Sequence, residues 1–443
     1  MTEAKIPQRW FVFFLFALVA LTLGFFSNAI VPLKKELAEL LMANSYDFSF
    51  ILASRSLPGL LLLIGFIGGI ILDKFGVYFT LILFSSLMLC GAFISAYAIS
   101  DHFRHSGFVF NFFNSFWDTC DPAVKLMAFG FFIFGLGSLV VRVSVSKLIA
   151  VWFRGGNVTT ALTLRSSSIK LGDSLAFLVS PIIFAHYGWK FPLWIGFSLI
   201  LISYLILICY LIFYEKKLGK HISKSSKKKF KFSFLGKLFT KRSFLLIFFF
   251  YLVFNGVFYP FVLFGSDLLR NRYHFTGVEG GLYFSGFILS TAFLSPIMGY
   301  ILDKGFSSGK LLFFGSFLFF LGMMLFMLSG LNPIIPMIAL LFGVACITSS
   351  IQSLVPKLVE MELLGTAFGA LNTIKNIGIY LMTLFLGFVL MYSNSDLDKE
   401  LDGDLNYDSE LMVVGFMSFF VFLFGFFIYK QLVKKKSAQV SNY

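Results

Sequence analysis

Two short stretches of this sequence nearly repeat one another: Gly69-Ile-Ile-Leu-Asp73-Lys74-Phe-Gly76 and Gly299-Tyr-Ile-Leu-Asp303-Lys304-Gly305. The same spacing separates the two leading glycines and the two aspartates. Each stretch follows a long apolar run at an equivalent place in its half of the chain. The simplest interpretation is an internal duplication in which both copies have the same orientation.

Long apolar runs surround both stretches. A membrane-spanning helix needs about 20 mostly apolar residues. By this criterion the candidates are approximately 10–32, 49–72, 78–100, 123–150, 158–184, 190–214, 243–265, 279–302, 310–330, 334–354, 365–391 and 410–430. None shows the period-two alternation of barrel strands. We therefore predict an all-α integral membrane protein, with twelve transmembrane helices in two six-helix bundles.

The distribution of charge predicts which side of the membrane each loop faces. Residues 215–242 hold ten Lys and one Arg against one acid, whereas Asp396–Glu410 holds seven acids and one Lys. Cytoplasmic loops are enriched in Lys and Arg, so the central segment and both termini are predicted to be cytosolic. The expected order is an N-terminal six-helix bundle (1–214), a basic cytosolic linker (215–242), a C-terminal six-helix bundle (243–432) and a basic cytosolic tail (433–443). The linker is either a solvated topogenic segment or a site for anionic lipid.

Composition excludes several classes of function. Hydrophobic residues make up 58% of the chain and charged residues 13%, about half the usual globular fraction of roughly 25%. Water-soluble enzymes and nucleic-acid binders are therefore not expected, and the net charge of +14 lies mainly in loops. No phosphate-binding loop or cluster of metal-ligand residues occurs, so we expect no enzyme activity, no cofactor and no metal. The expected partners are the lipid bilayer and a small-molecule substrate.

The repeated stretches resemble the loop motif of the major facilitator superfamily, roughly G-x-x-x-D-[RK]-x-G. The resemblance implies a gating role for Gly69, Asp73, Lys74, Gly76, Gly299, Asp303 and Lys304. An aspartate at the C-terminal end of a helix opposes that helix's dipole and needs an outside partner. In this superfamily the partner is the start of a helix from the other half. The resemblance therefore implies that Asp73 faces Gly365–Thr366 and that Asp303 faces Thr159–Thr160.

A second resemblance covers the predicted fourth and fifth helices. Trp152-Phe153-Arg154-Gly155, Ser167 and Lys170-Leu-Gly172 are similar to the eukaryotic branch that includes the lysosomal dipeptide uniporter. Two positions depart from that branch: Lys170 stands where the branch usually has Arg, and Leu139 stands where it has a Glu implicated in peptide recognition.

Ionisable side chains inside spans are costly and commonly line a transport pathway. In the N-terminal half we select Lys170, Arg142 and Asp173 as substrate-binding candidates. Lys170 and Asp173 are three residues apart on one helix face and are expected to pair; Arg142 or Arg55 is a second neutralising group for Asp173. Arg55, Arg165 and Lys147 are weaker candidates near span ends, where long side chains snorkel. The alternative is a structural ion pair between packed helices.

The C-terminal half offers two polar stripes as substrate-binding candidates. One contains Tyr251, Asn255 and Tyr259 at spacings of four, and the other contains Asn372, Lys375 and Asn376. Interhelical hydrogen bonding is the alternative interpretation. Asn28 and Gln352 are weaker candidates.

These features favour a secondary transporter that moves a small zwitterionic or anionic solute by alternating access, with short peptides or amino acids leading. Asp173 is the only acid well inside a span, which favours facilitated diffusion. A proton-coupled organic-anion or sugar-phosphate transporter is the alternative, and a non-transporting receptor or assembly subunit is a second one. Both a lysosome-like or vacuolar membrane and the plasma membrane remain open, as do a monomer and a homodimer.

Overall fold

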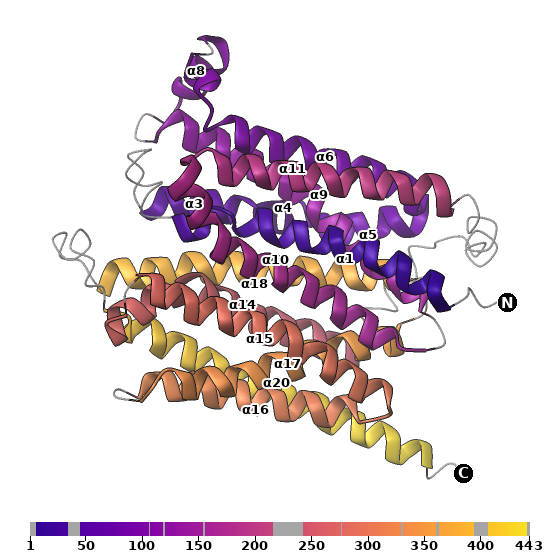
Figure 1. Ribbon diagram of the computed structural model, residues 1–443. Helices are drawn as coiled ribbons and strands as arrows, with labels where there is room; N and C mark the ends of the chain where they lie inside the picture. Colours follow the sequence, from indigo (N-terminus) through magenta and orange to yellow (C-terminus); the bar gives the residue numbers. More distant parts are fainter. Residues whose placement is uncertain are drawn as a thin grey trace. The chain divides into compact units, whose positions relative to one another are not determined.

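A computed structural model describes residues 6–33, 45–105, 107–117, 120–153, 156–215, 242–275, 277–328, 331–359, 363–393 and 406–440 (Figure 1). The regular elements in these ranges are all helices, and eleven of the helices are long and apolar enough to cross a membrane. Continuous helices satisfy their backbone polar groups internally, as a hydrocarbon environment requires. The predicted all-α membrane fold is thereby confirmed.

The described helices belong to two compact units. The first unit contains residues up to Trp152, the chain from Ser168 onward through the sixth predicted span, and Phe368–Thr373. Its elements are α1 (Ile6–Asn28), η1 (Val31–Leu33), α3 (Ser45–Ser54), α4 (Leu57–Leu61), α5 (Ile64–Phe75), α6 (Val77–Tyr97), α7 (Asp101–His105), α8 (Gly107–Asn114), α9 (Pro122–Trp152), most of α10 (Val158–Tyr187), α11 (Phe191–Tyr210) and η2 (Leu211–Glu215). Within this unit α6 packs against α9 and α11, and α1 packs against α11 (Figure 1).

The second unit contains Phe153–Ser167, the later helices and the chain from Ile374 onward. Its helices are α14 (Arg242–Tyr273), α15 (Gly277–Asp303), α16 (Ser308–Met327), α17 (Ile334–Leu358), most of α18 (Leu364–Ser393) and α20 (Asp408–Val440). Here α16 packs against both α17 and α20, and α15 packs against α17. The first turns of α10 thus belong with the later helices, and a short piece of α18 belongs with the earlier ones.

The second predicted span is not one continuous helix, which corrects the expectation for 49–72. It consists of α3, α4 and α5, with breaks after Ser54 and after Leu61. Pro58 has no backbone N–H to continue the hydrogen-bond ladder across the first break. At the second break Leu63 adopts a left-handed conformation with φ of 46°. This span is therefore missing from the eleven long helices, because no single piece of it is long enough.

Two predicted features lie outside the described residues. Most of the basic linker 215–242 and of the acidic loop Asp396–Glu410 is in this category, so the lipid role of the linker remains a prediction. The bundle boundaries at 214 and 243 also remain predictions. The short helices α7 and α8, between the third and fourth spans, were not predicted, because neither is long enough to give a hydropathy signal.

Candidate functional site

Two arginines of the first unit converge on one residue of α1. The Arg142 Nη2 atom on α9 donates a hydrogen bond of 3.3 Å to the Ser27 hydroxyl. Arg55, directly after α3, donates through Nη1 to the Ser27 carbonyl oxygen. The Nε atom of Arg142 is buried and has no hydrogen-bond partner. A guanidinium with a buried, unused N–H donor is a ready partner for a carboxylate.

The next residue of α1, Asn28, reaches the half-buried acid Asp173 of α10. Its Nδ2 atom donates a hydrogen bond of 2.7 Å to Oδ1 of Asp173. Close packing of α1 on α10 makes this contact possible, because a Cβ atom on Gly24 would collide with the Ile169 carbonyl oxygen and one on Gly172 would collide with the Leu21 carbonyl oxygen. Small residues allow helices in membranes to approach in this way.

We name this group of side chains the N cluster: Ser27, Asn28, Arg55, Arg142, Lys170 and Asp173. Lys170 is half-buried on α10, three residues before Asp173. Asn28 donates one hydrogen bond to Asp173, and the expected pairing of Asp173 with Lys170 remains a prediction. The N cluster brings together cations and one carboxylate from helices that are far apart in the sequence.

A second polar group lies in the second unit, and we name it the C cluster: Arg165, Tyr251, Tyr259 and Lys375. The Lys375 Nζ atom on α18 donates a hydrogen bond of 2.7 Å to the Tyr259 hydroxyl on α14 and lies 4.2 Å from the centre of that ring. The Tyr251 phenol, two turns earlier on α14, is within electrostatic range of Lys375, Tyr259 and Arg165. Arg165 is buried. Its position near the end of a span had led us to expect that it would snorkel, and it does not.

The three candidate asparagines have different surroundings. Asn255 is buried, and its amide donates to the Tyr251 carbonyl oxygen of its own helix at 2.7 Å. Asn376 is buried on α18. Asn372 donates a hydrogen bond of 3.2 Å to the carbonyl oxygen of Leu139 on α9. Asn372 thus makes the interhelical hydrogen bond that was the alternative interpretation, whereas Asn255 bonds within its own helix. The substrate role of both residues remains a prediction.

The gating motif of the C-terminal half makes the contact that the resemblance implies. The Asp303 carboxylate at the end of α15 accepts hydrogen bonds from the Thr160 backbone N–H and hydroxyl, each at 2.8 Å, and from the Thr159 N–H at 3.4 Å. These N–H groups belong to the first turn of α10, whose positive dipole end stabilises an anion. Gly299, one turn earlier, allows α15 to lie directly against Thr163.

The motif aspartate of the N-terminal half has a partner that sequence did not reveal. Asp73, whose side chain is 1% exposed, forms an ion pair with Lys147 of α9. The same helix α5 meets α18 closely, because a Cβ atom on Gly369 would collide with the Gly65 carbonyl oxygen and come within 3.3 Å of the Gly69 Cα atom. The implied contact of Asp73 with Gly365–Thr366 remains a prediction.

The other motif residues shape the turns after the aspartates. Gly76 has φ of 88° and Gly305 has φ of 103°, a left-handed region that favours glycine. Lys74 and Lys304 lie over the rings of Phe75 and Tyr300, at 5.2 and 5.3 Å from the ring centres.

Two cavities among the described residues lie apart from both clusters. One, of about 410 Å³, is lined by residues of α15 and α17 that include Phe287 and Leu341. The other, of about 640 Å³, adjoins Arg272 and Asp408. The candidate site therefore rests on the polar side chains. Sequence reasoning missed Ser27, whose only signal was its place beside Asn28, and ranked Arg55 and Asn28 low.

Polar clusters lie among the membrane-crossing helices, and the Asp303 carboxylate binds the start of α10, a helix far away in the sequence. These features define a transporter of the major facilitator type. The family model for the Major Facilitator Superfamily matches residues 12–383, and the chain belongs to that superfamily.

Several named proteins and solved structures are similar to this chain. The lysosomal dipeptide transporter MFSD1 of Danio rerio is 25% identical over 373 residues, covering 81% of this chain and 75% of the relative. The Mus musculus protein of the same name is 22% identical over 375 residues, with the same two coverages. Among solved structures, the proton:xylose symporter XylE bound to 6-bromo-6-deoxy-D-glucose superposes with a TM-score of 0.70 at 15% identity, covering 95% of this chain and 96% of that one. The structural likeness shows the fold.

Proposed function

We propose that this transporter moves a small zwitterionic solute, with dipeptides leading and amino acids next, by alternating access and without coupling to a proton gradient. The observation that carries the proposal is Arg142, a guanidinium among transmembrane helices with a buried, unpartnered Nε atom. Ionisable groups inside a membrane are costly and are kept mainly for function.

The N cluster has the chemistry to bind both ends of such a solute. Arg142 and Arg55 supply donors for a carboxylate, and guanidinium–carboxylate pairs form strong, often bidentate hydrogen bonds. Asp173, now bonded to Asn28, is an acceptor for an α-amino group. In the C cluster, Lys375 and Tyr259 remain candidate donors for a carboxylate.

The relatives support dipeptides as the first choice, because those proteins are named lysosomal dipeptide transporters. Leu139 stands where that branch has a Glu, so the amino group of a peptide would depend here on Asp173. An organic anion or sugar phosphate carried with protons is the second candidate, and Asp173 would then be the titrating group.

We also propose that the contact between Asp303 and the start of α10 acts as a latch. Three hydrogen bonds to a carboxylate at a helix start stabilise one arrangement of these helices. Release of the latch would accompany the transport cycle. The proposed membrane is lysosome-like, with both termini in the cytosol, on the support of the relatives' names and of the basic segments.

Substrate binding by the purified protein tests the proposed solute class. We would measure thermal stabilisation by a panel of dipeptides, amino acids, sugar phosphates and dicarboxylates, because a ligand that binds only the folded state raises the unfolding midpoint. Stabilisation by dipeptides, reduced in Arg142→Gln and in Asp173→Asn, is the expected result.

A matched control separates binding from general charge effects. Lys310, an exposed cation on α16 far from either cluster in sequence, serves for this purpose, and Lys310→Gln should leave the stabilisation unchanged. Stabilisation by dicarboxylates alone, insensitive to Asp173→Asn, would replace the zwitterion by an anion as substrate.

A further inference from the structure

The helix α8 exposes apolar side chains outside the membrane-crossing helices. It lies between the spans formed by α6 and α9, and the residues 107–117 contain no charged side chain. Phe108 is 86% exposed and Phe112 is 57% exposed, and Phe116 and Trp117 are exposed as well. Exposed apolar residues on the spans face lipid, but α8 is outside them, so its exposed face needs another explanation.

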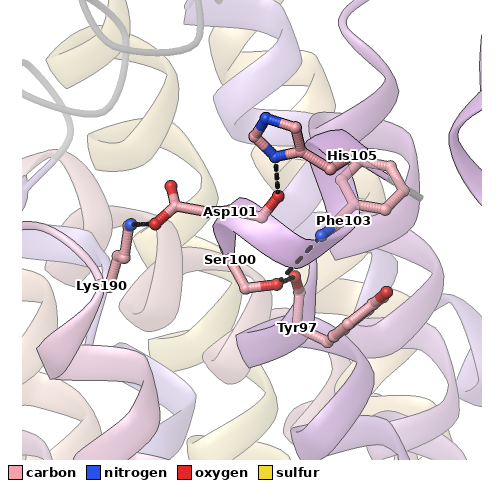
Figure 2. Close-up of polar contacts among 6 residues, drawn as sticks. All are labelled: Tyr97, Ser100, Asp101, Phe103, His105 and Lys190. Atoms are coloured by element: carbon pink, nitrogen blue, oxygen red, sulfur yellow. Dashed lines mark hydrogen bonds and ion pairs between the residues drawn. The ribbon is translucent and has the colours of Figure 1, made fainter.

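An ion pair connects α7, the segment before α8, to the helix bundle. Asp101 of α7 forms an ion pair with Lys190, the residue that caps the start of α11 (Figure 2). Within the same turn, the Asp101 carbonyl oxygen is 2.8 Å from Nδ1 of His105, and the Phe103 N–H donates to the Ser100 hydroxyl at 3.3 Å (Figure 2). Figure 1 shows α8 beyond this turn, standing off from α6 and α11.

Aromatic contacts continue from α7 into α8. The fully buried Phe103 ring lies 5.7 Å from the Phe110 ring and 6.1 Å from the Tyr97 ring. The inner side of α8 is therefore held by ring contact with α7.

The other end of α8 is tied to the start of the span α9. Lys125, in the first turn of the span α9 and only 5% exposed, donates hydrogen bonds to the Phe113 carbonyl oxygen at 2.8 Å and to that of Phe116. A cation at a helix C-terminus is favourable to the helix dipole. The Phe113 ring also contacts Phe129, one turn deeper in the span, at 6.3 Å between centres. Phe129 is itself 47% exposed.

The side chains of α8 divide into three faces. Phe108 and Phe112, one turn apart, form the exposed aromatic face. Val109, Phe110 and Phe113 are half-buried towards the protein, and Asn111 and Asn114 form an exposed polar face. A short helix with separate apolar and polar faces, tied to the first turn of a span, has the geometry of an interfacial helix.

We propose that α8 is a membrane-interface anchor whose Phe108 and Phe112 insert between the lipid headgroups and acyl chains of the leaflet where α9 begins. Aromatic side chains concentrate at that level in membrane proteins. The occupant of the aromatic face is the lipid surface, because Lys125 and Phe129 tie α8 to the first turns of the candidate membrane span α9. The anchor would hold the loop between α6 and α9 against the membrane.

Spin labelling in lipid nanodiscs tests the depth of this face. Starting from the full chain with the exposed cysteines Cys90 and Cys209 changed to Ser, a nitroxide is attached at Phe108→Cys, Phe112→Cys or Asn114→Cys. Collision rates with oxygen, which concentrates in the bilayer, and with a water-soluble nickel chelate are measured at each position.

The proposal predicts high oxygen and low nickel accessibility at 108 and 112, and the reverse pattern at the matched position 114. Nickel accessibility at 108 and 112 equal to that at 114 would show that the face is in water and would overturn the anchor. Protection from both reagents would mean that protein, such as a second copy, covers the face, which would also overturn it.

Discussion

At the level of single residues, Arg142 carries the proposed binding chemistry. We expect Arg142→Gln to weaken substrate binding by roughly 10- to 100-fold, because hydrogen bonds to charged groups contribute about 1.5–3 kcal/mol. Isothermal titration with the best dipeptide of the panel measures the change. Ser27→Ala removes the hydroxyl that accepts from Arg142 and should have a smaller effect. Unchanged affinity in Arg142→Gln would place the site elsewhere.

Asp303 is the second residue with a specific expectation. Asp303→Asn removes the charge at the start of α10, which stabilises such a contact by about 1 kcal/mol, or about fivefold in the latch equilibrium. Thr163 lies beneath Gly299 and is buried. A Thr163→Cys reporter, in the background without Cys90 and Cys209, should therefore be alkylated faster when Asp303→Asn is added. An equal alkylation rate in the two proteins would argue against the latch.

Residues also show the limit of sequence reasoning. Asp303 was assigned a partner because a known motif specifies it, and the contact is present. Lys147 was not assigned to Asp73, because apolar periodicity does not say which helices are neighbours. Ser27 was missed for the same reason: its importance comes from two arginines that approach from α9 and from beside α3.

At the level of elements, the long helices were predictable and the broken one was not. Hydropathy averages over about 20 residues and so joined α3, α4 and α5 into one span. The break depends on Leu63, whose left-handed backbone costs a residue with a side chain about 1–2 kcal/mol. Such strain is a property of packing and has no hydropathy signal.

The strain at Leu63 gives a prediction about stability. Leu63→Gly should leave the unfolding midpoint unchanged or raise it, because glycine adopts φ of 46° without steric cost. Its neighbour Leu62 is similarly exposed but has φ of −105°, so Leu62→Gly should destabilise by about 0.5–1 kcal/mol. Thermal unfolding in detergent compares the two, and equal losses would show that the turn at Leu63 is not strained.

The ion pair between Asp101 of α7 and Lys190 gives a prediction about pH. The hydrogen bond and charge of Lys190 hold the pKa of Asp101 below its usual 3.8. A lowered folded-state pKa gives stability that is fully present above 3.8 and is lost only as pH falls through the folded value. We expect the small difference in unfolding midpoint between wild type and Asp101→Asn to be the same at pH 7 and pH 5. Its disappearance at pH 5 would contradict this assignment.

At the level of the whole molecule, the repeated motif and the count of apolar runs were enough to predict the superfamily. A duplicated motif fixes equivalent points in two halves, and that information survives where overall identity to relatives is only 22–25%. Substrate identity depends on a few side chains. The departure at Leu139 is an example, because this one position lacks the acid that the dipeptide-transporter branch has there.

Uptake into proteoliposomes is the most direct measurement of what the protein does. Purified protein is reconstituted, and initial rates are recorded for labelled dipeptides, amino acids and organic anions, with and without an imposed pH gradient. We predict saturable dipeptide uptake at the same rate in both conditions, and its loss in Arg142→Gln. Organic-anion uptake that requires the gradient, with no uptake of any peptide or amino acid, would contradict zwitterion transport by facilitated diffusion.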